Sequence, residues 1–280
     1  MKRMAVLGAG TMGHGIAYAA TAAGFETRMF DVSEASLQKG LAAIEAVTRK
    51  GVDVGALSVS AANDLRTRLV ATSSLAMALD GVDFVIEAAP ERIDLKLALM
   101  TEIEQHAPAA ATVATNTSAL SITEMAGVMK NPSRVAGMHF FNPVHRMKLV
   151  EIVRALESSP ETLQAIEDVA RRMGKETVVV RESPGFITTR VNASIGNEAF
   201  YMLMEGVASA RDIDKALKLG LNHPMGPFEL GDLVGLDTRL SILEYLHRSM
   251  GEKYRPCPLL AQYVKAGRLG RKVGRGVYQY

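Results

Sequence analysis

Short apolar runs in the first half of the chain alternate with segments that have helical spacing. Five runs have the length and composition typical of buried strands: residues 4–7, 27–30, 84–91, 112–118 and 134–141. Between them lie segments with helical periodicity or helix-capping residues: residues 14–24, 33–50, 58–68 and 95–106. Strands that alternate with helices predict a parallel sheet with helices on both faces, which is a doubly wound α/β fold.

After Pro184 the pattern changes to helices, and no strand of the same quality follows. Apolar residues recur every four positions at the start of this half and predict one apolar helix face: Ile187, Val191, Ile195 and Ala199. Residues 209–220 are typical of a capped helix that ends at a glycine. We therefore place a domain boundary near Ser183, with an α/β domain in residues 1–183 and an all-α domain in residues 184–280.

Composition narrows the class of protein. The chain has 280 residues, of which 48% are hydrophobic and 22% charged, which is typical of a soluble globular protein. A net charge of +2 is too small to predict binding to nucleic acid or to a membrane surface. The one cysteine, Cys257, favours a reducing compartment, and six scattered histidines predict no metal site. Glycines interrupt the apolar N-terminus, so we expect no signal peptide, no transmembrane span and a cytoplasmic protein.

The connection between the first strand and the first helix fits the G-x-G-x-x-G pattern of dinucleotide-binding turns. We predict that this turn contacts a cofactor through Gly8, Gly10, Thr11, Met12 and Gly13. Glycines permit a tight turn and a close approach to a pyrophosphate, and the helix N-terminus offers N–H groups to it. Asp31 ends the next strand, where its carboxylate can accept a hydrogen bond from a ribose 2′-hydroxyl and repel a 2′-phosphate. The pattern predicts a Rossmann-type domain that binds NAD, and the alternative is a purely structural strand–helix turn.

Polar side chains end three of the predicted strands, at the edge where such a sheet places its substrate. These side chains are Glu91, Asn116, Ser118 and His139. Removal of a hydride from a carbinol carbon requires a base for the hydroxyl proton, and histidine suits that role at neutral pH. Glu151 is the candidate carboxylate that fixes the tautomer of His139. The alternatives are structural: a packed histidine, a solvated glutamate, and Ser118 as the N-cap of the following helix.

Several longer segments together resemble one family, and the match spans nearly the whole chain. The segments are "GAGTMGHGIA", "ATNTSALSITEMA", "GMHFFNPVHRMKLVEIV", "SPGFITTR", "NHPMGPFELGDLVGLD" and "GRLGRKVGRGVYQY". They are similar to the L-3-hydroxyacyl-CoA dehydrogenase family, especially its short members that act on 3-hydroxybutyryl-CoA. The "HFFNP" block and the "LGRKxGxG" tail are far more specific than the glycine pattern.

The resemblance implies a role for each matching residue around the substrate. It implies that His139 is the general acid/base and that Glu151 orients it. Ser118 matches the serine that donates a hydrogen bond to the reacting oxygen, and we expect Asn142 of "HFFNP" to contact the substrate as well. The implied reaction interconverts a short-chain (S)-3-hydroxyacyl-CoA and its 3-ketoacyl-CoA.

The resemblance also implies cofactor contacts. Asn116 and Glu91 match residues at the nicotinamide end of NAD, and Lys96 matches a lysine near the nicotinamide ribose. Arg49 and Lys50 end a long predicted helix, where they could meet the phosphates of CoA or be a solvated helix end.

One position departs from the family. Relatives usually carry asparagine where this chain has Thr189, the second threonine of "GFITTR". That asparagine helps to bind the substrate oxygens. Threonine keeps a donor and an acceptor but is shorter, so we place Thr189 among the catalytic candidates with its contact to the substrate open.

The resemblance further implies a homodimer formed through the helical domain. The partners are then an acyl-CoA substrate and a second copy of the chain, with no nucleic acid and no membrane. Two alternatives stay open: a sugar-acid dehydrogenase of the same architecture, of the gulonate type, and a non-catalytic protein that binds NAD.

Overall fold

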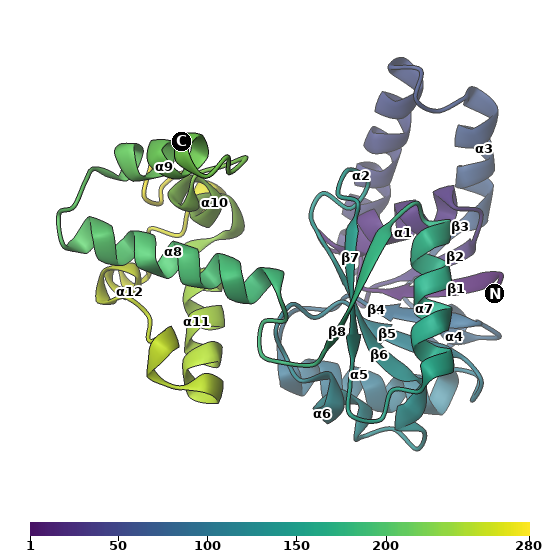
Figure 1. Ribbon diagram of the computed structural model, residues 1–280. Coiled ribbons are helices and arrows are strands. Elements are labelled where there is room, and N and C mark those ends of the chain that lie inside the picture. Colours follow the sequence, from purple (N-terminus) through teal and green to yellow (C-terminus); the bar gives the residue numbers. More distant parts are fainter. The chain divides into compact units, whose positions relative to one another are not determined.

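An eight-stranded sheet forms the centre of the first of two units, residues 1–182 and 183–280, which together are all the residues that this computed structural model describes (Figure 1). The strands lie side by side in the order β3-β2-β1-β4-β5-β6-β7-β8. Their bounds are β1 Arg3–Leu7, β2 Glu26–Phe30, β3 Leu69–Thr72, β4 Phe84–Glu87, β5 Thr112–Thr115, β6 Val135–Phe140, β7 Leu149–Arg154 and β8 Glu176–Arg181. Every neighbouring pair is parallel except β6 and β7, which are antiparallel.

Helices connect all of these strands except β6 and β7. They are α1 Gly13–Ala22, α2 Glu34–Asp53, α3 Val59–Arg68, α4 Leu75–Leu79, α5 Ile93–His106, α6 Ile122–Ala126 and α7 Pro160–Arg172, with a short 3-10 turn η1 Pro132–Arg134. Serine side chains cap α2, α3 and α7 by accepting a backbone N–H, which satisfies donors that have no partner within the helix.

The central strands are apolar on both faces because helices cover both. Met4 and Val6 of β1 pack in one cluster with Ile16 of α1 and Ile166 of α7. The alternate residue Ala5 points to the other face, and it is also fully buried. The predicted doubly wound α/β fold is confirmed.

Sequence patterns missed several elements of this unit. The helices α4 and α7 and the strands β3, β7 and β8 were not predicted, and two predicted strands end early, at Glu87 and Thr115. The important omission is β7, because its antiparallel pairing with β6 means that the sheet is not parallel throughout. The edge strands β3 and β8 do carry short apolar runs, residues 69–71 and 178–180, but β3 is mostly half-buried and β8 mostly exposed, unlike the central strands.

The second unit is helical, as predicted. Its helices are α8 Thr188–Met204, α9 Ala210–Gly220, α10 Pro227–Val234, α11 Leu236–Met250 and α12 Pro258–Lys265, with 3-10 turns η2 Glu252–Tyr254 and η3 Arg271–Val273. Phe200 of α8 packs edge-to-face on Phe228 of α10, and Leu243 and Leu246 of α11 join the same core.

The last residues of the chain fold back onto α10. The buried carboxylate of Asp232 accepts hydrogen bonds from the backbone N–H groups of Val277 (2.8 Å) and Tyr278 (2.9 Å). A Cβ atom at Gly276 would lie 1.9 Å from Asp232 Oδ1, so only glycine fits there. This contact explains a glycine of the C-terminal "GRKVGRG" segment. No helix of either unit has the length and apolar character needed to cross a membrane.

Candidate active site

The glycine turn lies between β1 and α1 at the carboxyl edge of the parallel strands. Gly8 has φ +113°, and a Cβ atom there would lie 2.5 Å from the carbonyl oxygen of Ala88. A Cβ atom at Gly13 would lie 1.8 Å from the carbonyl oxygen of Gly8. Gly10 differs, because nothing lies within 4 Å of where its Cβ would be. The protein therefore requires glycine at two positions, whereas the third leaves open space over which a phosphate could approach.

Asp31 lies directly after β2 and helps to shape this turn. One carboxylate oxygen accepts a hydrogen bond from the backbone N–H of Ala9 (2.9 Å), and the other accepts from Ser33 N–H (2.9 Å). Two carboxylate oxygens offer about four acceptor positions, so both bonds leave capacity for a ribose hydroxyl. The turn residues Thr11 and Met12 are exposed and half-buried respectively.

A buried ion pair that the sequence did not suggest joins the last residue of β4 to α5. Lys96 of α5 is 1% exposed, and its Nζ lies 2.7 Å and 2.9 Å from the two carboxylate oxygens of Glu87, which is fully buried. Thr115 also donates to Glu87, through its Oγ1 at 2.5 Å. Lys96 lies 3.6 Å from Glu91 as well. Glu87 was missed because a glutamate at the end of an apolar run gives no sign of the lysine that neutralises it.

Glu91 organises the segment that carries Ser118. Its Oε1 accepts hydrogen bonds from Thr117 Oγ1 (2.7 Å) and from the backbone N–H groups of Ser118 (2.7 Å) and Ala119 (3.2 Å). Ser118 is half-buried, and it does not cap the next helix, since Ser121 caps α6. The alternative of Ser118 as an N-cap is therefore wrong.

Asn116 ties the ends of β5 and β6 together. Its side-chain oxygen accepts a hydrogen bond from the backbone N–H of Phe140 (2.9 Å), the residue after His139. Its own backbone N–H donates to the carbonyl oxygen of Glu87 (2.8 Å). Asn116 is 8% exposed, so its amide is held in place next to the histidine strand.

The antiparallel pair β6–β7 brings His139 and Glu151 face to face. The two residues are direct partners in the strand register, and His139 Nδ1 lies 2.7 Å from Glu151 Oε2. The histidine is 5% exposed and the glutamate is fully buried. If the imidazole is neutral, this geometry favours the tautomer in which Nδ1–H donates to the carboxylate, so that Nε2 is the basic nitrogen.

The connection between β6 and β7, residues 141–148, carries the other polar candidates of this edge. Asn142 is exposed. Burial lowers the pKa of the His145 imidazole, and the positive charges of Arg146, Lys175, His14 and Lys50 lower it further. Lys50 therefore lies close enough to act electrostatically on this connection. Arg49 and Lys50 are both exposed at the end of α2.

Thr189 belongs to the second unit. It lies in the first turn of α8 and is half-buried. Its proposed contact with the substrate stays a prediction.

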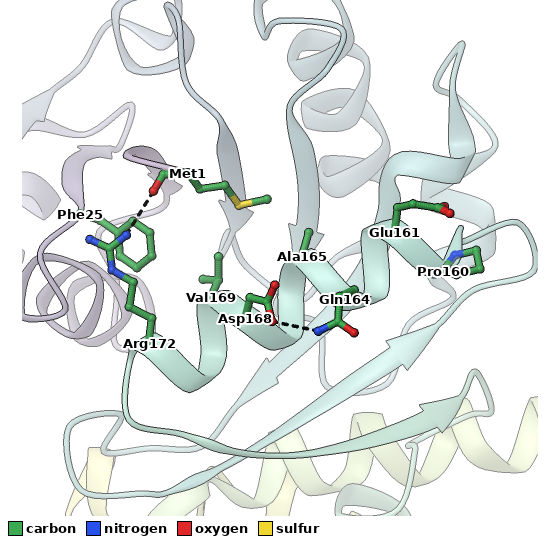
Figure 2. Close-up of a pocket in the computed structure, with 9 residues that line it drawn as sticks. All are labelled: Met1, Phe25, Pro160, Glu161, Gln164, Ala165, Asp168, Val169 and Arg172. Carbon is green, nitrogen blue, oxygen red and sulfur yellow. Dashed lines mark hydrogen bonds between the residues drawn. The ribbon is translucent and has the colours of Figure 1, made fainter.

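A hollow of about 670 Å³ lies elsewhere in the first unit, beside α7 (Figure 2). Phe25 and Val169 line its apolar part, and the guanidinium of Arg172 lies 3.8 Å from the centre of the Phe25 ring. Phe25 precedes β2, so the hollow is at the amino-terminal edge of the strands, opposite the glycine turn. It contains none of the predicted site residues, so the candidate site remains at the carboxyl edge.

Comparison with known proteins gives a consistent match over the whole chain. Residues 3–183 match the model of the 3-hydroxyacyl-CoA dehydrogenase, NAD binding domain, and residues 185–280 match that of the 3-hydroxyacyl-CoA dehydrogenase, C-terminal domain. A probable 3-hydroxybutyryl-CoA dehydrogenase of Bacillus subtilis (strain 168) is 45% identical over 281 residues, which cover 100% of this chain and 98% of the relative. The 3-hydroxybutyryl-CoA dehydrogenase of Bradyrhizobium diazoefficiens is 42% identical, with 100% and 96% covered.

A solved structure has nearly the same fold. The crystal structure of (S)-3-hydroxybutyryl-CoA dehydrogenase PaaH1 from Ralstonia eutropha has a TM-score of 0.96 and 41% identity to this chain. The alignment covers 100% of this chain and 99% of that one.

Proposed function

The chain belongs to the 3-hydroxyacyl-CoA dehydrogenase family, and we propose that it interconverts a short-chain (S)-3-hydroxyacyl-CoA, 3-hydroxybutyryl-CoA first, with the matching 3-ketoacyl-CoA. It is an oxidoreductase with NAD(H) as its cofactor. The observation that carries the proposal is the buried His139–Glu151 pair, 2.7 Å apart at the same sheet edge as the glycine turn.

Oxidation of the substrate removes a hydride from C3 and a proton from the hydroxyl on that carbon. The acceptor for the hydride would be supplied by bound NAD⁺. His139 takes the proton at Nε2, because Nδ1 is engaged by Glu151. The buried carboxylate then stabilises the positively charged imidazolium and keeps the ring in its orientation. In the reverse direction His139 returns the proton to the oxygen.

The residues at the carboxyl edge fit NAD. The open space over Gly10 and the N-terminus of α1 can receive the pyrophosphate, with Thr11 and Met12 beside it. The carboxylate of Asp31 can accept a hydrogen bond from a hydroxyl of the adenosine ribose. Asn116 is bonded to the residue after His139, and Glu91 is bonded to the segment that carries Ser118. The ammonium of Lys96 is buried in its ion pair with Glu87, so it is not assigned a direct contact with NAD. We propose instead that Lys96 positions Glu91, which contacts the nicotinamide end of the cofactor.

The substrate contacts are assigned by chemistry and position. Ser118 follows β5 and can donate its hydroxyl to the C3 oxygen, while Asn142 follows β6 in the connection next to the histidine. Arg49 and Lys50 are exposed cations suited to the phosphates of CoA. Thr189 is assigned to a substrate oxygen.

Two further properties follow from the same proposal. We place the protein in the cytoplasm, in fatty acid metabolism, and we propose a homodimer formed through the second unit. The support for the dimer is exposed apolar surface at one end of α8, where Ile187 is 51% and Val191 53% exposed.

An assay of NADH absorbance with a panel of substrates tests the proposal. We expect turnover with acetoacetyl-CoA or 3-hydroxybutyryl-CoA, and none with gulonate or other sugar acids. Turnover with sugar acids alone would favour the sugar-acid dehydrogenase, and no turnover with any substrate despite NADH binding would favour the non-catalytic alternative.

A further inference from the structure

We propose that Lys175 is a positioning residue that holds the connection between β6 and β7, and through it the His139–Glu151 pair. This inference rests on the proposed function, since it concerns the residues to which that function assigns proton transfer. Lys175 lies between α7 and β8 and is 8% exposed. No residue of the second unit takes part in the contacts that follow.

The ammonium of Lys175 supplies donors that the connection lacks. Its Nζ donates hydrogen bonds to the backbone carbonyl oxygens of Val144 and of Met147, the second at 2.9 Å. Within the connection, the N–H groups of Arg146 and Met147 both donate to the carbonyl oxygen of Pro143, at 3.0 Å each. Val144 is 2% exposed, so without Lys175 its carbonyl would lose a donor that water cannot readily replace.

This arrangement is unusual for a lysine. A buried ammonium normally faces a carboxylate, but the partners of the Lys175 ammonium are backbone carbonyl oxygens, and burial lowers its pKa. Three N–H donors in a compact group can satisfy several backbone carbonyls at once, which an apolar side chain cannot do. The hydrogen bonds to residues 141–148, the connection that follows β6, therefore offset the cost of burying this charge.

The sheet register brings Lys175 to that connection. Strand β8 is parallel to β7, with Glu176 beside Leu149, and the N–H of Glu176 donates to the carbonyl of Lys148 (2.9 Å). The residue just before β8 thus lies against the end of residues 141–148. Figure 1 shows β7 and β8 side by side in this arrangement.

The connection also packs on the helix of the glycine turn. A Cβ atom at Gly15 of α1 would lie 3.0 Å from the side chain of Val144, so these surfaces are in close contact. The ring of Tyr18, also in α1, meets His145 edge-on at 6.2 Å. Both Lys175 and α1 therefore contact the connection, whose two ends continue into the strands of His139 and Glu151.

A double-mutant cycle tests the proposal. Lys175→Met keeps most of the aliphatic stem and removes the three donors. We expect it to lower kcat roughly 10-fold or more, because small displacements of a catalytic group are costly, while the Kd for NADH, measured by its fluorescence, changes less than about 2-fold. In the His139→Gln background the same change should alter the residual kcat less than about 2-fold, because the group that Lys175 positions is gone. Lys148→Met, an exposed lysine of the same connection, is the matched control and should leave kcat unchanged.

The outcomes separate the two proposals. A wild-type protein that turns over no acyl-CoA contradicts the proposed function itself. An active wild type with an unchanged Lys175→Met variant, or with the same fold loss in both backgrounds, overturns the positioning role and leaves the function standing. If Lys175→Met does not fold, Lys175→Gln, whose amide nitrogen is uncharged and one bond closer to the backbone than the ammonium, is put through the same cycle and read in the same way.

Discussion

The imidazole of His139 is the side chain whose loss should stop the reaction while leaving the fold in place. We expect His139→Gln to lower kcat roughly 10²- to 10⁴-fold, the usual contribution of a positioned acid/base. The amide of glutamine can still donate to Glu151, so folding and NADH binding should be close to wild type. His106→Gln, an exposed histidine at the end of α5, is the control. Wild-type turnover in a folded His139→Gln variant would exclude this histidine as the base.

We predict that Asp31, also at the residue scale, selects NAD(H) over NADP(H). Its carboxylate repels a 2′-phosphate, so the wild type should strongly prefer NAD(H) to NADP(H). Asp31→Asn removes the charge and keeps an oxygen for the N–H of Ala9. The preference in kcat/KM should then fall about 10- to 100-fold, since a hydrogen bond to a charged group contributes roughly 1.5–3 kcal/mol. Asp53→Asn, at the exposed end of α2, should have no such effect.

Substitutions of Thr189 test whether its hydroxyl makes the substrate contact that the family resemblance assigns to an asparagine. Thr189→Val keeps the shape and removes the hydroxyl. The loss of one neutral hydrogen bond costs roughly 0.5–1.5 kcal/mol, or about 2- to 13-fold in kcat/KM. Thr189→Ser keeps the hydroxyl and should stay within about 2-fold of wild type. If Thr189→Val equals wild type with every acyl-CoA tested, the substrate oxygen is held by another group.

At the scale of elements, the C-terminal segment depends on its fit against Asp232 of α10. Gly276→Ala would place a methyl group 1.9 Å from Asp232 Oδ1 and disrupt the carboxylate that accepts from Val277 and Tyr278. We expect the free energy of unfolding to fall by about 1–3 kcal/mol, as for other overpacked sites. The matched control is Gly220→Ala at the exposed end of α9, where nothing lies within 4 Å of the new atom. Equal melting temperatures for the two variants would contradict this account of the tail.

Sequence patterns predicted most of the central alternating elements and, among those that they missed, the reversed strand β7 matters most. The parallel strands β1, β4 and β5 are buried on both faces, so their apolar runs are visible in the sequence. Nothing in the run around Glu151 indicates whether that strand is parallel or antiparallel to its neighbour. The pairing of His139 with Glu151 was a hypothesis from residue chemistry that the family resemblance supported, and the structure supplies its physical cause, the β6–β7 register.

The buried pair of Glu87 and Lys96 was beyond prediction for a related reason. The two residues are nine positions apart, and they meet only because the chain leaves β4 and returns through the start of α5. Spacing alone does not distinguish this pair from two solvated charges on a loop and a helix. The sequence therefore predicts Lys96 near the cofactor but does not predict the buried carboxylate of Glu87 with which it pairs.

At the scale of the whole molecule, the exposed apolar surface of α8 predicts a second copy of the chain. We expect Val191→Glu, which puts a charge on a 53% exposed position, to weaken association, because an unpaired charge is costly to bury in an interface. Sedimentation should show a dimer for the wild type at micromolar concentration and a larger monomer fraction for the variant. Val59→Glu, at a 64% exposed position of α3 in the other unit, is the control. A stable wild-type monomer would rule the dimer out.

The antiparallel pairing of β6 and β7 also affects how the His139–Glu151 pair can be retained as the sequence changes during evolution. Neighbouring parallel strands must be joined by a long crossover, so groups on them are brought together by distant parts of the chain. His139 and Glu151 instead meet at a separation of 12 residues within one hairpin. A single short stretch of coding sequence therefore carries both members of the pair together with the turn that aligns them. Insertions in the other connections of the sheet can leave this His139–Glu151 pair, the proposed proton-transfer group, intact.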